Sequence, residues 1–162
     1  MDAPTTPQPP AGTTWRDLMD VAFGEACKAA QAGEAPIGAA LFTPTGTLLA
    51  SAHNRPIATH DPTGHAEILC LREAARVMGN YRLPDTIMAV TLEPCLMCTG
   101  ALIHARVAGV VFAARDERAG ALVSNLQGCS LPFANHRLWT VEGVMGSECS
   151  ALLKRFFLER RK

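Results

Sequence analysis

Apolar residues along this chain follow two patterns, a helical period and short apolar runs. From residue 15 to 32 they fall on one face of a helix, with Thr14 as its N-cap and Gly33 at its end. Similar spacing predicts further helices over residues 65–78, 95–105 and 147–160. Short apolar runs predict strands over residues 37–42, 47–52, 87–92, 107–113 and 138–141.

The order of these elements is the main guide to the fold. Helices alternate with short apolar strands, which predicts an α/β protein whose sheet is covered by helices on both faces. The 162 residues suit one domain, and we find no internal repeat. Residues 54–64 and 115–135 are predicted loops, and the second is long enough to be a candidate for functional contacts.

The start of the chain differs from the rest in composition. Residues 1–13 are rich in Pro, Thr and Ala, so we expect a disordered tail before a single domain over residues 14–162. This tail lacks the basic start and apolar run of a signal peptide, and no apolar stretch is long enough to cross a bilayer. We therefore expect a soluble, cytoplasmic protein without a membrane partner.

The formal net charge is zero, but bases outnumber acids near the C-terminus. Five cations, at residues 154, 155 and 160–162, stand there beside one acid, Glu159. Such a cluster is compatible with nucleic-acid binding. It is equally compatible with cations that stabilise the end of a helix, so charge alone leaves both interpretations open.

Only two of the six cysteines have a spacing that indicates chemistry. Cys95 and Cys98 form a Cys-x-x-Cys pair at the predicted start of a helix, where unpaired N–H groups favour thiolates. This spacing is common for two zinc ligands. A redox dithiol is the competing interpretation, but no thioredoxin-like pattern surrounds the pair.

A histidine and a carboxylate complete the candidate zinc site. The sequence holds no second Cys-x-x-Cys, and His65 is the best candidate for a third ligand. Three protein ligands leave zinc an open position, which is the mark of a catalytic site that activates water. Glu67 lies two residues from His65 and does not face the same way on a helix, so it can move protons instead of binding metal. The alternative is that Glu67 only caps a helix start.

His-x-Glu followed by Pro-Cys-x-x-Cys is the known motif of zinc-dependent nucleobase deaminases. Both halves occur here, at residues 65–67 and 94–98, each at a predicted helix start. With its flanking segments, the chain resembles the bacterial tRNA adenosine deaminases of the cytidine and deoxycytidylate deaminase superfamily. The resemblance covers about residues 15–161. Its flanking segments are residues 54–56, 60–63, 80–83, 100–106, 114–116, 135–137 and 156–161.

The resemblance implies a cytidine-deaminase-like fold, a three-layer α/β/α sandwich around a mixed five-stranded sheet, and a homodimer. It implies hydrolytic deamination of adenosine to inosine at the wobble position of a tRNA anticodon, with the base flipped out of the loop into a pocket. It assigns Zn²⁺ to His65, Cys95 and Cys98, and proton transfer to Glu67. It assigns substrate binding to Asn54, Asp116, Asn135 and Arg160.

These outer residues also have simpler explanations. Asn54 could finish a strand, Asp116 could fix its own loop, and Arg160 could be solvated. The chain departs from the family at Gly64, where Ala is common, and at Ala113, where Gly is common. Two other functions stay open. One is a deaminase of a free nucleobase or nucleotide (guanine, cytosine or dCMP class) on the same fold, and the other is a non-catalytic zinc protein that binds RNA.

Overall fold

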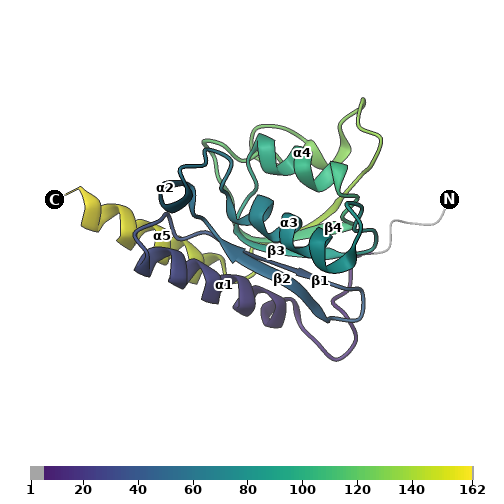
Figure 1. Ribbon diagram of the computed structural model, residues 1–162, viewed down its shortest axis with the longest axis horizontal. Helices are drawn as coiled ribbons and strands as arrows, with labels where there is room; N and C mark the ends of the chain where they lie inside the picture. The colour runs from purple at the N-terminus through teal and green to yellow at the C-terminus, as the bar shows by residue number, and fades with distance from the viewer. Residues whose placement is uncertain (1–5, 162) are drawn as a thin grey trace.

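A computed structural model describes residues 6–161 of the chain. Its centre is a five-stranded sheet with the strand order β2-β1-β3-β4-β5 (Figure 1). β1 pairs antiparallel with β2 and β3, whereas β3, β4 and β5 run parallel, so the sheet is mixed as predicted. Every predicted strand is present within two residues of its expected bounds. The strands are β1 (Gly38–Phe42), β2 (Leu48–His53), β3 (Ile87–Leu92), β4 (Gly109–Ala114) and β5 (Trp139–Glu142).

Helices cover both faces of this sheet, which confirms the predicted three layers. α1 (Trp15–Gln31) and α5 (Gly146–Arg160) pack on one face, and Figure 1 shows them side by side below the strands. α3 (Ala66–Met78) and α4 (Leu96–His104) pack on the other face. The one-turn helix α2 (Pro56–Thr59) and the 3-10 turn η1 (Gly128–Ser130) lie inside the two predicted loops.

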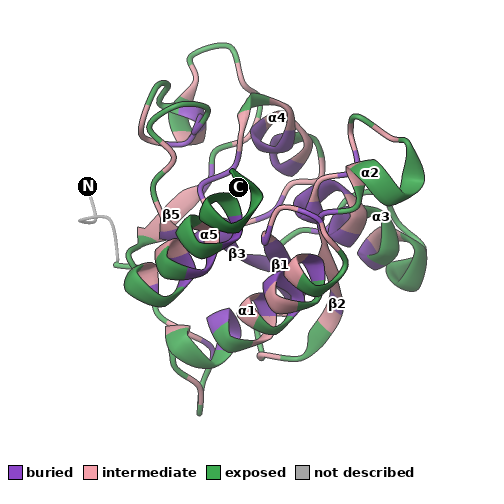
Figure 2. Ribbon diagram, turned by 90° about the vertical axis from the view of Figure 1, so that its left-hand side faces the viewer, coloured by how far each residue is buried: buried purple, intermediate pink, exposed green. Residues whose placement is uncertain are grey.

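Alternate residues of the central strands supply two separate cores. In β1, Leu41 packs with the core beneath α3 and α4, and Ala40 packs with the core beneath α1 and α5. β3 and β4 alternate in the same way, so residues on both faces of the central strands are buried. Figure 2 shows this buried centre between helices with exposed outer surfaces. Burial on both faces explains why the sequence shows these strands as continuous apolar runs.

Strand direction decides which loops meet. β2 runs parallel to β3 and β4, because β1 is antiparallel to both of its neighbours. The segments that follow β2, β3 and β4 therefore leave the sheet at one edge, and they begin with Asn54, Glu93 and Arg115. This carboxyl edge is where open α/β sheets place their ligand sites.

The start of the described chain corrects one expectation. Residues 6–13 were expected to bury little, but Pro10 is buried and lies against Gly46 in the turn between β1 and β2. The Pro10 carbonyl accepts hydrogen bonds from the N–H and the hydroxyl of Thr13, at 3.0 and 2.7 Å. A proline ring is apolar and rigid, so it can dock on a turn without a longer apolar segment. The rest of the predicted tail, residues 1–5, and the cation Lys162 lie outside the described residues.

Thr14 and Asp17 cap α1 reciprocally. The Thr14 hydroxyl accepts from the Asp17 N–H, and the Asp17 carboxylate accepts from the Thr14 N–H at 2.6 Å. This capping box confirms the start of the helix predicted from the sequence. None of the helices within residues 6–161 combines the length and the hydropathy that a membrane span needs.

The core beneath α3 and α4 gives a stability test at Phe112, a large and fully buried side chain. Phe112→Ala should lower the free energy of unfolding by about 3–5 kcal/mol, because it removes buried apolar surface and leaves a cavity. Phe133 is 85% exposed, so Phe133→Ala should change the same quantity by less than about 0.5 kcal/mol. Urea unfolding of the zinc-loaded protein measures both, and equal losses would contradict this assignment of the core.

Candidate functional site

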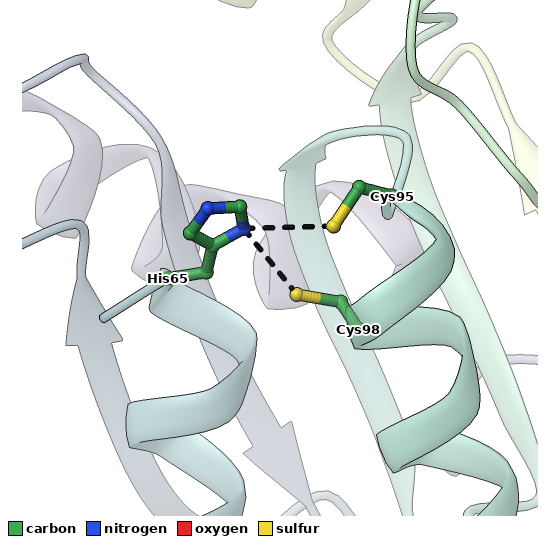
Figure 3. Close-up of side chains that lie close together, drawn as sticks. All are labelled: His65, Cys95 and Cys98. Atoms are coloured by element: carbon green, nitrogen blue, oxygen red, sulfur yellow. Dashed lines mark hydrogen bonds between the residues drawn. The ribbon is translucent and has the colours of Figure 1, made fainter. Parts of the chain in front are cut away.

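Three metal-binding side chains meet where two helices begin. His65 is the N-cap of α3, Cys95 is the N-cap of α4, and Cys98 lies in the first turn of α4. Their ligand atoms all lie within 4.8 Å of one another. Figure 3 shows the His65 ring directing one nitrogen at both sulfurs. This nitrogen is Nδ1, and it lies 3.6 Å from each Sγ.

These separations fit one tetrahedral zinc ion. A nitrogen at about 2.05 Å and a sulfur at about 2.3 Å from zinc, at the tetrahedral angle, lie about 3.6 Å apart. Both measured distances from Nδ1 to sulfur have this value. Among the described residues, the group contains no fourth His, Cys, Asp or Glu ligand. His65, Cys95 and Cys98 therefore form a potential zinc site in which one position is left for water or substrate.

Hydrogen bonds within the site shift the pKa values of Cys95 and His65 in opposite directions. Hydrogen bonds from Cys98 and from His65 lower the pKa of the Cys95 thiol to about 4, so Cys95 is a thiolate at neutral pH. The hydrogen bond with Cys95 in turn raises the pKa of His65. The N-terminus of α4 also favours thiolates, whereas the hydrogen bond with Cys95 and burial raise the pKa of the Cys98 thiol.

Glu67 lies beside the metal ligands without belonging to them. It is 4% exposed, and burial raises its pKa to about 7. A carboxyl group whose pKa lies near the working pH can both accept and donate a proton. The Glu67 carboxyl group also forms a side-chain hydrogen bond with Cys98. This placement supports proton transfer by Glu67, which stays a prediction.

Asn54 is tied to the start of α3 and is 5% exposed. Its Oδ1 accepts a hydrogen bond from the Ala66 N–H at 2.8 Å, one residue after His65. Within residues 6–161 its amide nitrogen donates to no protein atom, and this nitrogen is not among the fully enclosed unpaired atoms. The amide oxygen of Asn54 is thus hydrogen-bonded within the protein, and its amide nitrogen is a donor that a ligand can reach.

Asp116 fixes its own loop, as the simpler explanation anticipated. Its Oδ1 accepts from the N–H groups of Arg118 and Ala119, at 3.0 and 3.2 Å. It also lines a groove of about 1110 Å³ between the loop after β4 and the C-terminal half of α5. The loop-fixing contacts do not test its predicted substrate role.

The structure does not bring Asn135 to the same edge. The Asn135 carbonyl accepts from Arg106 at 2.6 Å, and Arg106 precedes β4, whereas Asp116 follows it. Six strand residues span roughly 20 Å, so Asn135 and Asp116 lie at opposite edges of the sheet. Contact between Asn135 and the anticodon loop stays a prediction.

Arg160 is also engaged within the protein. Its Nη2 donates to the Gly33 carbonyl at 2.5 Å, and its guanidinium carbon lies 4.2 Å from the centre of the Phe156 ring. Arg160 therefore joins α5 to the end of α1 and is not simply solvated. Contact between Arg160 and a phosphate stays a prediction.

Sequence reasoning missed two buried carboxylates near these residues. Glu93 directly precedes the Pro-Cys motif and is 2% exposed. Glu34 accepts from the N–H groups of Ile57 and Ala58, and so holds the start of α2. The sequence held a signal for Glu93, since a carboxylate between a buried apolar strand and a metal motif requires hydrogen-bond partners. Glu34 left no such signal.

Comparisons with known proteins agree with this site. The zinc-binding region of cytidine and deoxycytidylate deaminases matches residues 13–114, which include the three candidate ligands and Glu67. The tRNA-specific adenosine deaminase of Haemophilus influenzae is 41% identical over 145 residues, 90% of this chain and 84% of that protein. The enzyme of the same name from Bacillus subtilis is 40% identical over 144 residues, 89% of each chain.

One solved structure, from studies of A-to-I editing by tRNA:A34 deaminases at the wobble position of transfer RNA, extends the match to the fold. It superposes with a TM-score of 0.82 at 36% identity, over 85% of this chain and 99% of that chain. The chain therefore belongs to the zinc-binding cytidine and deoxycytidylate deaminase family and, within it, to the tRNA-specific adenosine deaminases.

Proposed function

We propose that this protein deaminates adenosine to inosine at the wobble position of a tRNA anticodon. One observation carries the proposal: the ligand atoms of His65, Cys95 and Cys98 converge within 4.8 Å, and the buried Glu67 lies beside them. The substrate follows from the relatives, which are named tRNA-specific adenosine deaminases at 41% and 40% identity. Zinc is the cofactor of the family.

The chemistry divides between the cofactor and the chain. Zinc, when bound by His65, Cys95 and Cys98, makes hydroxide available at neutral pH. Glu67 accepts one proton from the water, whose oxygen bonds to C6 of the adenine ring, and delivers this proton to N1. Glu67 then takes the remaining proton of the added hydroxyl and gives it to the exocyclic amine, so the bond from C6 to nitrogen breaks, ammonia leaves and the C6 carbonyl of inosine forms. The balance is adenosine plus water to inosine plus ammonia, and Glu67 ends in its starting state.

The proposal includes the partners and the location. The partner is a tRNA anticodon loop, whose single-stranded bases can leave the stack and enter a pocket. We also propose a homodimer, for which α3 and α4 offer a groove of about 400 Å³ lined by apolar residues that include Ile68, Leu71 and Ala101. The reaction would take place in the cytoplasm, where tRNA is found.

The deciding experiment compares an anticodon stem-loop carrying wobble adenosine with free adenosine, guanine, cytidine and deoxycytidylate. We expect inosine in the stem-loop only, detected after nuclease digestion. Deamination of a small molecule alone would keep the chemistry and overturn the tRNA substrate. No turnover by zinc-loaded protein would favour the non-catalytic RNA-binding alternative. Sedimentation of the same sample measures its mass, and an active monomer would refute the homodimer.

Glu67→Ala tests the proton transfer. It should lower kcat by at least about 100-fold, because general acid–base catalysis contributes about 10²–10⁴-fold, while zinc content stays at the wild-type value. Glu73→Ala is the matched control, since Glu73 lies exposed on the same helix and pairs with Arg76. Turnover that persists in Glu67→Ala would show that another group carries the proton.

Two substitutions distinguish the role of the Asn54 amide oxygen from that of its amide nitrogen. Asn54→Asp keeps the acceptor for the Ala66 N–H but loses the amide donor, so KM for the stem-loop should rise about tenfold with zinc content unchanged. Asn54→Ala loses both ends, and it should also lower the free energy of unfolding by about 1 kcal/mol. Steady-state kinetics and urea unfolding measure the two effects. An unchanged KM in Asn54→Asp would leave Asn54 only the task of holding α3.

A further inference from the structure

The carboxylate of Glu93 is buried and satisfied entirely by one loop. Its Oε1 accepts from the N–H groups of Val123 and Ser124, at 2.8 and 2.9 Å. Its Oε2 accepts from the Asp116 N–H at 3.1 Å and from the Ser124 hydroxyl at 2.5 Å. Within residues 6–161, Glu93 forms no salt bridge. Four donors from residues 116–124 thus occupy all acceptor positions of the two oxygens.

The same loop, residues 116–124, also pairs with the backbone of the segment that contains Pro94 and Cys95. The Pro94 carbonyl accepts from the Ala121 N–H at 2.9 Å, and Cys95 forms a β-bridge with Gly120. Gly120 has no room for a side chain, because an added Cβ would lie 2.4 Å from the Glu93 carboxyl carbon. Glu93, Pro94 and Cys95 therefore contact the loop residue by residue.

This loop forms one wall of the groove described above. Across the groove from residues 115–119 lie the α5 residues Leu153, Lys154, Phe157 and Leu158, together with Arg161, which follows α5. The groove begins at the carboxyl edge of the sheet, since Leu92, the last residue of β3, also lines it. Glu93 thus stands between the candidate zinc site on one side and the groove wall on the other.

We infer that Glu93 is a positioning residue that holds residues 115–124 against the metal-ligand segment, so that the wall of the groove is already formed when RNA binds. The inference rests on the proposed function, because it assigns the groove to RNA next to the flipped adenosine. A loop that is ordered before binding does not lose that conformational freedom on binding. Glu93 acts on substrate binding through the loop, and it touches neither substrate nor metal.

Glu93→Gln is the direct test. Each carboxylate oxygen accepts from two donors, so an amide NH₂ placed at either oxygen faces two donors and cannot accept from them. Rotating the amide by 180° does not restore the hydrogen bonds, because the NH₂ group would then face the two donors of the other oxygen. We expect KM for the stem-loop to rise at least about tenfold, while kcat changes less than about threefold. Zinc content should stay at the wild-type value.

Hydrogen exchange supplies a readout that needs no RNA. In Glu93→Gln the amides of Asp116, Val123 and Ser124 should exchange faster than in the wild type, because they lose their acceptor. Glu148→Gln is the matched control, since it makes the same chemical change at an exposed carboxylate that pairs with Arg16 and does not line the groove. It should leave KM within about twofold of the wild type.

Gly120→Ala perturbs the loop without changing the carboxylate. Its methyl group would push the loop away from Glu93, so it should raise KM and speed exchange in the same residues. Unchanged KM and unchanged exchange in both variants would overturn the inference. Loss of zinc from folded Glu93→Gln protein would also overturn it, because Glu93 would then support the ligands and not the loop. If the wild type did not act on the stem-loop, the proposed function would fail, yet the exchange data would still decide whether Glu93 holds this loop.

Discussion

The convergence of two helix N-termini at one edge of the sheet is the constraint on which the site depends. α3 and α4 begin with His65 and Cys95 in extended backbone conformations, at ψ of 149° and 176°. These N-cap positions bring both side chains to the gap between the helices, and Cys98 follows one turn later. The hydrogen bond from the Ala66 N–H to Asn54 fixes the first helix to the end of β2. The N-terminal ends of both helices add positive potential that favours thiolates.

The sequence was sufficient for the layers and for the metal ligands, because both leave local patterns. Short apolar runs mark the strands, an apolar period of 3.6 residues marks the helices, and a Cys-x-x-Cys pair after a strand has the spacing of two zinc ligands. The helix α2 leaves no such pattern, since one turn is too short to show a period. Its start is held by Glu34, which lies 23 and 24 residues from the amides that it accepts from. Contacts between distant segments of this kind cannot be read from local spacing.

The outer site residues show a second limit. Resemblance to a family identified Asp116, Asn135 and Arg160 by type, but the edge of the sheet that each occupies follows from strand direction. Asn135 precedes β5 and contacts Arg106 before β4, so parallel pairing of these strands places it at the edge opposite Asp116. Arg160 finds its carbonyl partner 127 residues away, at Gly33. The identity of a residue is therefore a weaker guide to its role than its partners.

Hydrogen-bond partners also distinguish two buried glutamates, Glu93 and Glu67, that have the same residue type. Burial alone would raise the pKa of Glu93, but hydrogen bonds from Ser124, Val123 and Asp116 hold it below its ordinary value. A carboxylate that is stabilised by four fixed donors stays ionised and holds structure. For Glu67 burial prevails, and the pKa rises to about 7. Since proton transfer needs a group whose two forms are close in free energy, Glu67 is suited to exchange protons and Glu93 is suited to fix a loop.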